Sequence, residues 1–272
     1  MNNSYEGLML PNDTRNEYGA KKNCDNFHLK LNKFLEFCND GFCLEEYKKD
    51  YNDNFIKSVI ERQKNTIKRM GITSNIENPL ILSPDWRMIV GLGNESVYET
   101  SITLHHIYGI PYIPGQAIKG VVRNWMITEL FGGIEKDALN DEGFCIIFGS
   151  PSKSKLGKHK GSLIFFDAFP VSAPSIKKDI MNPHYSPYYS ENQPPADYHN
   201  PIIIPFLTVE NTKFKFVVGV KECDNKKVER KKLEELGGDT LLSIGEIWLK
   251  KALAEHGIGA KTSVGYGRLR EC

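Results

Sequence analysis

Hydrophobic residues recur along this chain at two different spacings, and each spacing predicts a different kind of element. Apolar residues three or four positions apart predict helices over residues 26–38 and about 44–70, the second ending at Gly71 as a left-handed cap. Residues 1–25 are polar and lack this period, so we expect an irregular lead-in there. The sequence therefore predicts a mainly helical N-terminal extension over residues 1–80 that packs on the main domain.

The pattern changes after Pro79 to short apolar runs rich in β-branched and aromatic residues. Such runs are typical of strands, and here turn residues separate them. They predict strands over residues 86–92, 98–108, 163–169, 202–209 and 214–220.

Two longer helices are predicted between and after these strands. Two prolines exclude regular helix before Gly115, and the apolar helix face that follows ends at the glycine pair beginning with Gly132. Thr240 is a suitable N-cap for a last helix, which Gly257 ends. A glycine-rich loop and a short strand then complete the chain.

The order of elements predicts an α+β fold, specifically a ferredoxin-like β-α-β-β-α-β unit with insertions. We expect this domain to span residues 81–272. Residues 172–201 form a Pro/Tyr-rich insertion. A loop this long is uncommon in a compact domain unless it binds something or is disordered, and its tyrosines argue against simple disorder.

Composition and charge limit how this protein could bind a nucleic acid. The chain has 272 residues, of which 40% are hydrophobic and 25% charged, as in ordinary globular proteins. Its 35 Lys and Arg residues nearly balance 34 Asp and Glu residues, which gives a formal net charge of +1. General attraction of the whole surface to polyanions is therefore excluded, and a nucleic-acid site must be a local patch.

Neither a metal site nor a membrane segment is predicted. The six cysteines form no CxxC pair, and Cys38, Cys43 and His28 lack the further ligands that zinc requires, so we expect no metal and no other cofactor. No secretory signal and no apolar run of about 18 residues is present. We expect a cytoplasmic protein with reduced thiols and no membrane partner.

The sharpest local signal is the segment HGIGAKTSVGYGRLR at residues 256–270. Its glycines let backbone amides approach a phosphate closely, and its Lys and Arg side chains add positive charge. It does not match a Walker A loop, because Ala260 and Glu255 stand where that motif requires glycine, and Thr262 likewise breaks the dinucleotide-binding fingerprint. The alternative is a glycine-rich turn between the last helix and an edge strand.

Two further basic segments are candidates for contact with phosphate. Gln116, Lys119 and Arg123 share one face near the start of a helix, where backbone amides and positive charge suit phosphate oxygens. The alternative is an ordinary solvated helix face. The lysine-rich loop at residues 150–162 either follows a nucleic-acid backbone or is simply a flexible, solvated loop.

Residues 109–123 read GIPYIPGQAIKGVVR, and residues 257–269 read GIGAKTSVGYGRL. Together these two motifs resemble the RAMP superfamily, the repeat-associated proteins of CRISPR systems. With YETSITLHH at residues 98–106 and DIMNPHYSPYY at residues 179–189, the chain also resembles the family of sixth Cmr subunits in type III-B effector complexes. The resemblance covers about residues 84–270.

The resemblance implies an RRM-related fold and a non-catalytic subunit that holds the 3′ portion of a CRISPR RNA in antiviral defence. The implied partners are CRISPR RNA, target RNA paired with the guide, and other Cmr RAMP subunits. The glycine-rich loop and the basic helix face would hold ribose-phosphate, and the insertion would stack on bases. The RNA-binding residues expected on this basis are Gln116, Lys119, Arg123, His184, Tyr185, Tyr188, Tyr189, Gly257, Gly259, Lys261, Thr262, Ser263, Gly265, Tyr266, Gly267 and Arg268.

Two other functions stay open at this point. One is a RAMP-type endoribonuclease that processes the CRISPR RNA precursor without a metal, using His105 or His106 with Lys119 as acid and base. Neither histidine has a partner carboxylate or nucleophile that the sequence reveals. The other is a protein-bridging scaffold that makes no RNA contact at the glycine-rich loop.

Overall fold

The computed structural model of the chain describes residues 24–33, 37–38, 41–42, 51–96, 98–182, 203–221 and 240–272. The chain divides into two compact units. Unit 1 comprises Met1–Lys49, Gly91–Pro111 and Ile176–Val209, and Unit 2 comprises Asp50–Val90, Tyr112–Ser175 and Glu210–Cys272.

Unit 2 is built on two short antiparallel sheets. The first has the strand order β14-β4-β12-β9, and the second has the order β3-β13-β8. The strands of the first sheet are β4 (Leu80–Pro84), β9 (Phe169–Pro170), β12 (Phe214–Phe216) and β14 (Leu269–Glu271). Those of the second are β3 (Ile72–Ser74), β8 (Leu163–Phe165) and β13 (Val218–Lys221). The short strand β5 (Arg87–Met88) follows β4, and β6 (Gly149–Ser150) pairs with β7 (His159–Lys160).

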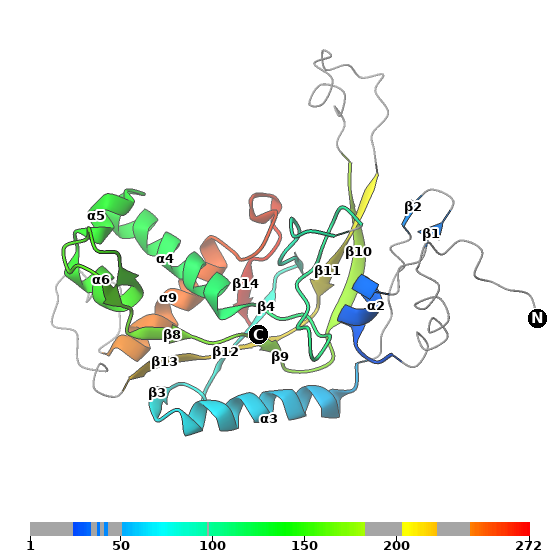
Figure 1. The fold of residues 1–272 in the computed structure, drawn as a ribbon, viewed down its shortest axis with the longest axis horizontal. Helices are drawn as coiled ribbons and strands as arrows, with labels where there is room; N and C mark the ends of the chain where they lie inside the picture. The colour runs from blue at the N-terminus through cyan, green and yellow to red at the C-terminus, as the bar shows by residue number, and fades with distance from the viewer. Residues whose placement is uncertain are drawn as a thin grey trace, which may run out of the picture. The chain divides into compact units, whose positions relative to one another are not determined.

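Helices cover both faces of the sheet strands in Unit 2 (Figure 1). Helices α4 (Gly115–Phe131) and α9 (Leu241–Glu255) pack against each other on one face. Gly245 lets α9 come close to the strands, since a Cβ there would lie 3.2 Å from Val218. Helix α3 (Asp53–Arg69) covers the other face, where its Ile67 packs with the neighbouring Val217. Two short helices, α5 (Glu135–Leu139) and α6 (Glu142–Phe148), follow α4.

The ends of the long helices confirm the capping signals in the sequence. Thr240 caps α9 in a reciprocal capping box with Ser243, and Gly132 ends α4 in the left-handed conformation. Gly71, at φ +62°, follows α3 as predicted. These three residues fix the start of α9 and the ends of α4 and α3.

Unit 1 holds helix α2 (Phe27–Lys33), the hairpin strands β1 (Phe37–Cys38) and β2 (Gly41–Phe42), and all but one end residue of each of the paired strands β10 (Ser175–Met181) and β11 (Ile204–Glu210). Its irregular segment, residues 91–111, is tied to α2 by the Asn26 amide. That group donates to the carbonyl oxygens of His106 at 2.8 Å and Ile107 at 3.0 Å. Backbone hydrogen bonds within the segment, such as that from the His105 amide to the Ile110 carbonyl at 2.8 Å, add to this contact.

The first two predicted helices differ from the structure. The helix predicted over residues 26–38 ends at Lys33, because residues 37–38 pair with residues 41–42 as a short antiparallel strand instead of continuing the helix. The helix predicted from residue 44 begins at Asp53, since the Asn52 side chain caps it by accepting from the Asn54 amide at 2.8 Å. Residues 44–50 lie outside the described part of the chain.

Two predicted strands are also wrong, and several strands, among them β3, β4 and β10, were not predicted. The run at residues 86–92 holds only the two-residue strand β5, and the run at 98–108 holds no named strand. Gly109, at φ +66°, turns the chain there, and its amide donates to the His105 carbonyl at 2.6 Å. Residues 175–181, predicted as loop, form β10, whose polar residues hid the strand signal. The other predicted strands appear within a few residues, so the mixed helix-and-sheet prediction is confirmed.

Candidate nucleic-acid interface

The glycine loop, residues 257–268, joins the end of α9 to β14 and is held firmly against the segment after β4. The Ala260 amide donates to the Ile89 carbonyl at 2.8 Å, and the Gly267 amide donates to the Arg87 carbonyl at 2.8 Å. Within the loop, the Ile258 amide donates to the Gly267 carbonyl at 2.8 Å. The loop is therefore a fixed surface of Unit 2 rather than a loose turn.

Most of the loop glycines are explained by contacts with the protein's own backbone. A Cβ on Gly259 would lie 2.0 Å from the Ile89 carbonyl oxygen, and one on Gly267 would lie 2.0 Å from the Ile258 carbonyl oxygen. Both glycines also have positive φ, at +95° and +69°. Gly265, at φ +97°, faces open space instead. Close packing thus accounts for glycines that the sequence suggested as phosphate contacts.

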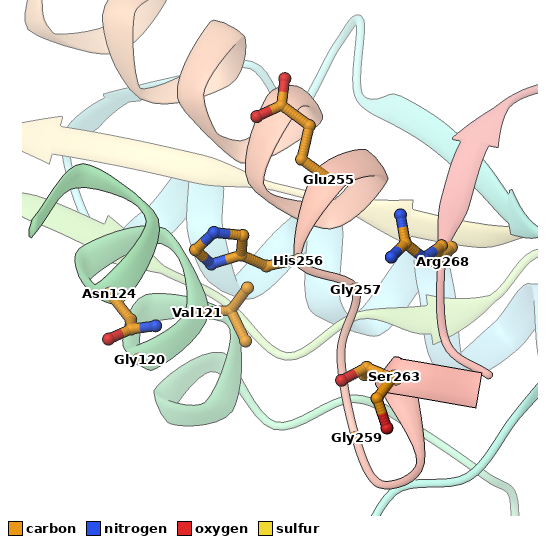
Figure 2. A pocket seen from close by; sticks show the side chains of 10 residues that line it. Gly120, Val121, Asn124, Glu255, His256, Gly257, Gly259, Ser263 and Arg268 are labelled. Atoms are coloured by element: carbon orange, nitrogen blue, oxygen red, sulfur yellow. The ribbon is translucent and has the colours of Figure 1, made fainter. Parts of the chain in front are cut away.

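An open groove lies between this loop and the two helices above the sheet (Figure 2). It has a volume of about 480 Å³. The loop residues that line it are Gly257, Gly259, Thr262, Ser263 and Arg268. Five of the predicted RNA-binding residues are therefore brought together on one wall.

The groove has free donors on its loop wall. Within the described residues, the amides of Thr262 and Ser263 donate to no other protein group. Lys261 precedes them in the left-handed conformation, at φ +61°, and its carbonyl accepts from the Tyr266 amide at 3.2 Å. Tyr266 itself is buried. The loop thus presents amides, hydroxyls and a guanidinium to a ligand.

Helix α9 ends beside the groove with Glu255, followed by its C-cap residue His256. Glu255 is held by the Trp125 indole, which donates to its carboxylate at 2.6 Å. Figure 2 shows the Glu255 side chain directed away from the loop, whereas His256 extends toward α4. His256 was not among the residues predicted to bind RNA, because a residue at a helix end carries no periodic signal of its own.

Helix α4 lines the other wall, but not with the three residues predicted from sequence. The lining residues are Gly120, Val121 and Asn124. Gln116 is exposed one turn before Gly120 on the same side of the helix. Positions 116, 120 and 124 are four residues apart and therefore lie on one side of the helix, so this spacing predicts Asn124 as a site residue. The prediction from sequence instead followed the positive charges of Lys119 and Arg123.

The two basic residues of α4 have environments of their own. Arg123 donates to the Glu135 carboxylate at 2.7 Å, and its guanidinium lies 5.2 Å from the centre of the Phe144 ring. Lys119 is half-buried, and this burial, followed by the nearby charge of Arg123, lowers the pKa of Lys119 below its ordinary value. Neither residue lines the groove.

The start of α4 is already occupied by a carboxylate. The Gly115 amide donates to Asp167 Oδ1 at 2.7 Å, and a Cβ on Gly115 would lie 2.2 Å from the Phe165 carbonyl oxygen. Asp167 is held in turn, since its carbonyl accepts from the Gln63 side chain at 2.6 Å. A negative group of the protein thus lies where the sequence suggested a phosphate.

The remaining predicted site residues lie outside the described part of the chain. They are His184, Tyr185, Tyr188 and Tyr189. The lysine-rich loop is described and exposed over Lys158, His159 and Lys160, but none of its residues lines the groove.

The two histidines of the nuclease hypothesis belong to Unit 1. The His105 ring stacks on His106, with centroids 5.0 Å apart, and on Tyr108 at 4.3 Å. His105 Nδ1 accepts from the backbone amides of Ile107 at 3.3 Å and Tyr108 at 3.4 Å. This nitrogen therefore serves the local turn. Lys119, the other member of the proposed pair, belongs to Unit 2.

Among the described residues, no group of three or more His, Cys, Asp or Glu side chains is placed to hold a metal ion. Cys43 lies outside these residues, so the prediction about the Cys38, Cys43 and His28 set stays a prediction. No helix in the described ranges is long and apolar enough to cross a membrane.

Comparison with known proteins decides the family. The model of the RAMP superfamily matches residues 82–270, which include the groove and both motifs. The chain belongs to the RAMP superfamily. Among RAMP proteins, it is 36% identical over 236 residues to the "CRISPR system Cmr subunit Cmr6" of Pyrococcus furiosus, an alignment covering 68% of this chain and 65% of that protein. The predicted resemblance to the sixth Cmr subunit is thereby confirmed.

Two further relatives extend the comparison. The chain is 25% identical over 240 residues to the "CRISPR system CMR subunit Cmr6" of Saccharolobus solfataricus, covering 86% of this chain and 68% of that protein. It also resembles a chain in the cryo-EM structure of the Type III-B Cmr-beta bound to cognate target RNA, with a TM-score of 0.56 and 19% identity. That match covers 99% of this chain and 79% of the other, and it supports the RAMP-type fold.

Proposed function

We propose that this protein is a non-catalytic, RNA-binding subunit of a type III-B CRISPR ribonucleoprotein, the Cmr effector complex. It holds the 3′ portion of the CRISPR RNA and contacts neighbouring Cmr RAMP subunits and the target RNA paired with the guide, in antiviral defence in the cytoplasm. The observation that carries the proposal is the groove of about 480 Å³ beside the glycine loop of a RAMP protein.

The chemistry of the groove suits a sugar-phosphate strand. The amides of Thr262 and Ser263 and the guanidinium of Arg268 are donors without specificity for a base. An open groove admits a continuous chain, whereas an enclosed pocket would select a small ligand. Because this donor set reads phosphate and ribose, binding should depend little on sequence and strongly on salt.

The α4 residues Gln116, Lys119 and Arg123 belong to the proposal as flanking contacts. They act through their side chains, because the Gly115 amide at the helix start already donates to Asp167. The remaining residues predicted from the sequence, including those of the 172–201 insertion, stay proposed RNA contacts on the strength of the family resemblance.

A ferredoxin-like core is part of the same proposal. In chain order, β4, β9, β12 and β14 are the first, second, third and fourth strands, so the sheet order β14-β4-β12-β9 is 4-1-3-2 with antiparallel neighbours. Helix α4 follows the first strand and α9 follows the third, as a β-α-β-β-α-β unit requires. The glycine loop connects α9 to the fourth strand of this unit.

The first test is binding of a fluorescein-labelled single-stranded RNA by the full-length protein, followed by anisotropy over a series of salt concentrations. If about four phosphates are contacted, the slope of log K against log salt should be on the order of −3. A slope near zero, or no binding to RNA, would contradict the proposal.

The second test separates a binder from a nuclease. The protein is incubated with CRISPR repeat RNA in EDTA, and the RNA is analysed on a denaturing gel. The proposal predicts intact RNA that still co-purifies with the protein. Specific cleavage that survives EDTA would instead favour the metal-independent endoribonuclease.

A further inference from the structure

Trp86 is unusual among the tryptophans of this protein. The chain has three, and Trp125 and Trp248 are buried at 2% and 0% exposure, whereas Trp86 is 51% exposed. A half-exposed indole leaves a large apolar surface in contact with water, which is unfavourable unless something covers it.

The Trp86 ring is backed by two other residues that hold it in place. The Tyr266 ring lies 4.9 Å from it, centroid to centroid, at an interplanar angle of 50°. The Arg87 guanidinium carbon lies 5.2 Å from the ring centre, and Arg87 is fixed by an ion pair with Glu210 at 3.1 Å. The indole is therefore preorganised, so a flat partner would lose little freedom in ordering it.

Backbone hydrogen bonds connect this aromatic surface directly to the glycine loop. Tyr266 belongs to the loop, and the Asp85 amide donates to the Arg268 carbonyl at 2.9 Å. Arg268 is also the cation that lines the groove. Trp86 therefore lies against the same loop that forms one wall of the groove.

The charge around Trp86 is suited to an anionic partner. Three arginines, Arg87, Arg268 and Arg270, outnumber the carboxylates of Asp85 and Glu210 in the segments that adjoin Trp86. The Arg270 side chain is 71% exposed even though it contacts Asp85 at 3.0 Å. Exposed ion pairs of this kind are weak, so Arg270 can exchange Asp85 for a phosphate.

We propose that Trp86 is a stacking platform for one nucleobase of the RNA strand whose backbone lies in the groove beside the glycine loop. This inference rests on the proposed RNA-binding function and adds to it a base contact that depends on stacking rather than on hydrogen bonds. An aromatic face accepts any of the four bases, so the platform binds RNA without selecting its sequence. Tyr266 and Arg87 act as positioning residues because they fix the indole.

The experiment uses two labelled single-stranded RNAs of equal length, an oligouridylate and a matched strand of abasic ribose-phosphate, with wild type, Trp86→Phe and Trp86→Ala. Anisotropy reports affinity, and tryptophan fluorescence reports contact with Trp86, because the other two indoles are buried. We expect Trp86→Ala to bind the oligouridylate roughly tenfold more weakly and Trp86→Phe to retain most of the affinity. The affinity of wild type for the abasic strand should be about as low as that of Trp86→Ala for the oligouridylate.

The outcomes separate the stacking role of Trp86 from the RNA-binding function of the protein. Quenching of wild-type fluorescence by oligouridylate but not by the abasic strand supports the platform. Unchanged RNA affinity of Trp86→Ala, with no quenching, overturns the platform while leaving the RNA-binding function in place. Failure of wild type to bind either strand overturns both. Normal RNA affinity of Trp86→Ala combined with lost assembly with other Cmr subunits overturns the platform and identifies Trp86 as a protein-docking residue.

Discussion

The start of α4 and the glycine loop carry the same kind of sequence signal, yet the structure gives them different surroundings. Both combine glycine with nearby cationic side chains, which is typical of phosphate sites. At the helix start, the Gly115 amide already donates to the Asp167 carboxylate. In the loop, the amides of Thr262 and Ser263 have no protein partner in the described part of the chain and line an open groove. A glycine-rich motif therefore indicates a phosphate site only where its donors are still unused.

Glycine substitutions should produce the largest effects, and they should differ within the loop. Gly115→Ala places a Cβ 2.2 Å from a carbonyl oxygen, and Gly267→Ala places one 2.0 Å from another. Each substitution should therefore lower the free energy of unfolding by about 3 kcal/mol. Gly265→Ala is the matched control, with a positive φ but open space around it, and should cost about 1 kcal/mol. Urea denaturation measures all three, and equal losses would show that backbone conformation rather than steric contact explains these glycines.

Arg268 should give the largest effect on RNA binding. Because its guanidinium lines the groove, Arg268→Ala should weaken binding to single-stranded RNA roughly tenfold and reduce the salt slope by about 0.7. Lys57→Ala is the control, since Lys57 is an exposed cation on α3, across the sheet from the groove. Anisotropy titrations measure both variants. A loss of affinity equal to that of Lys57→Ala would remove Arg268 from the interface.

Asp167 distinguishes the helix start from the loop most directly. Asp167→Ala removes the acceptor of the Gly115 amide, so it should lower the free energy of unfolding by about 1 kcal/mol. RNA affinity should change by no more than about twofold, because phosphate does not occupy that end of α4. If RNA affinity instead fell as far as in Arg268→Ala, the helix start would belong to the interface.

Lys119→Ala should weaken RNA binding less than Arg268→Ala does, and its effect should depend on pH. Lys119→Ala should weaken RNA binding roughly two- to threefold at neutral pH, as expected of a flanking charge. Burial lowers the pKa of Lys119 below 10.5, so on raising the pH this side chain loses its proton before an ordinary lysine does. The difference in affinity between wild type and the variant should therefore shrink before ordinary lysines deprotonate. A difference that stays constant to that point would contradict this role.

Local signals predicted the framework of Unit 2 because the physics behind them is local. The Thr240 cap, the Gly132 stop and the apolar face of α4 each depend on neighbours within a few residues. The loop at residues 257–268 was likewise predicted as the candidate site from its composition alone.

The unpredicted features depend on residues far apart in the sequence. No local pattern reveals that Asp167 reaches the amide of Gly115, or that the Ile89 carbonyl requires a glycine at residue 259. The same holds for Trp86. Its sequence context predicts only the first residue of a strand, whereas its contact with Tyr266 joins residues that are far apart in the chain. Tertiary contacts of this kind decide which glycines, donors and aromatic rings are left for a ligand.

Hydrogen–deuterium exchange of the full-length protein, with and without saturating single-stranded RNA, tests the central claim most directly. The claim is that main-chain amides of the glycine loop hold the ribose-phosphate backbone. The account predicts slower exchange in peptides covering residues 257–268 on RNA binding and unchanged exchange in the α3 peptides covering residues 53–69. Bound RNA that leaves exchange in residues 257–268 unchanged would contradict it.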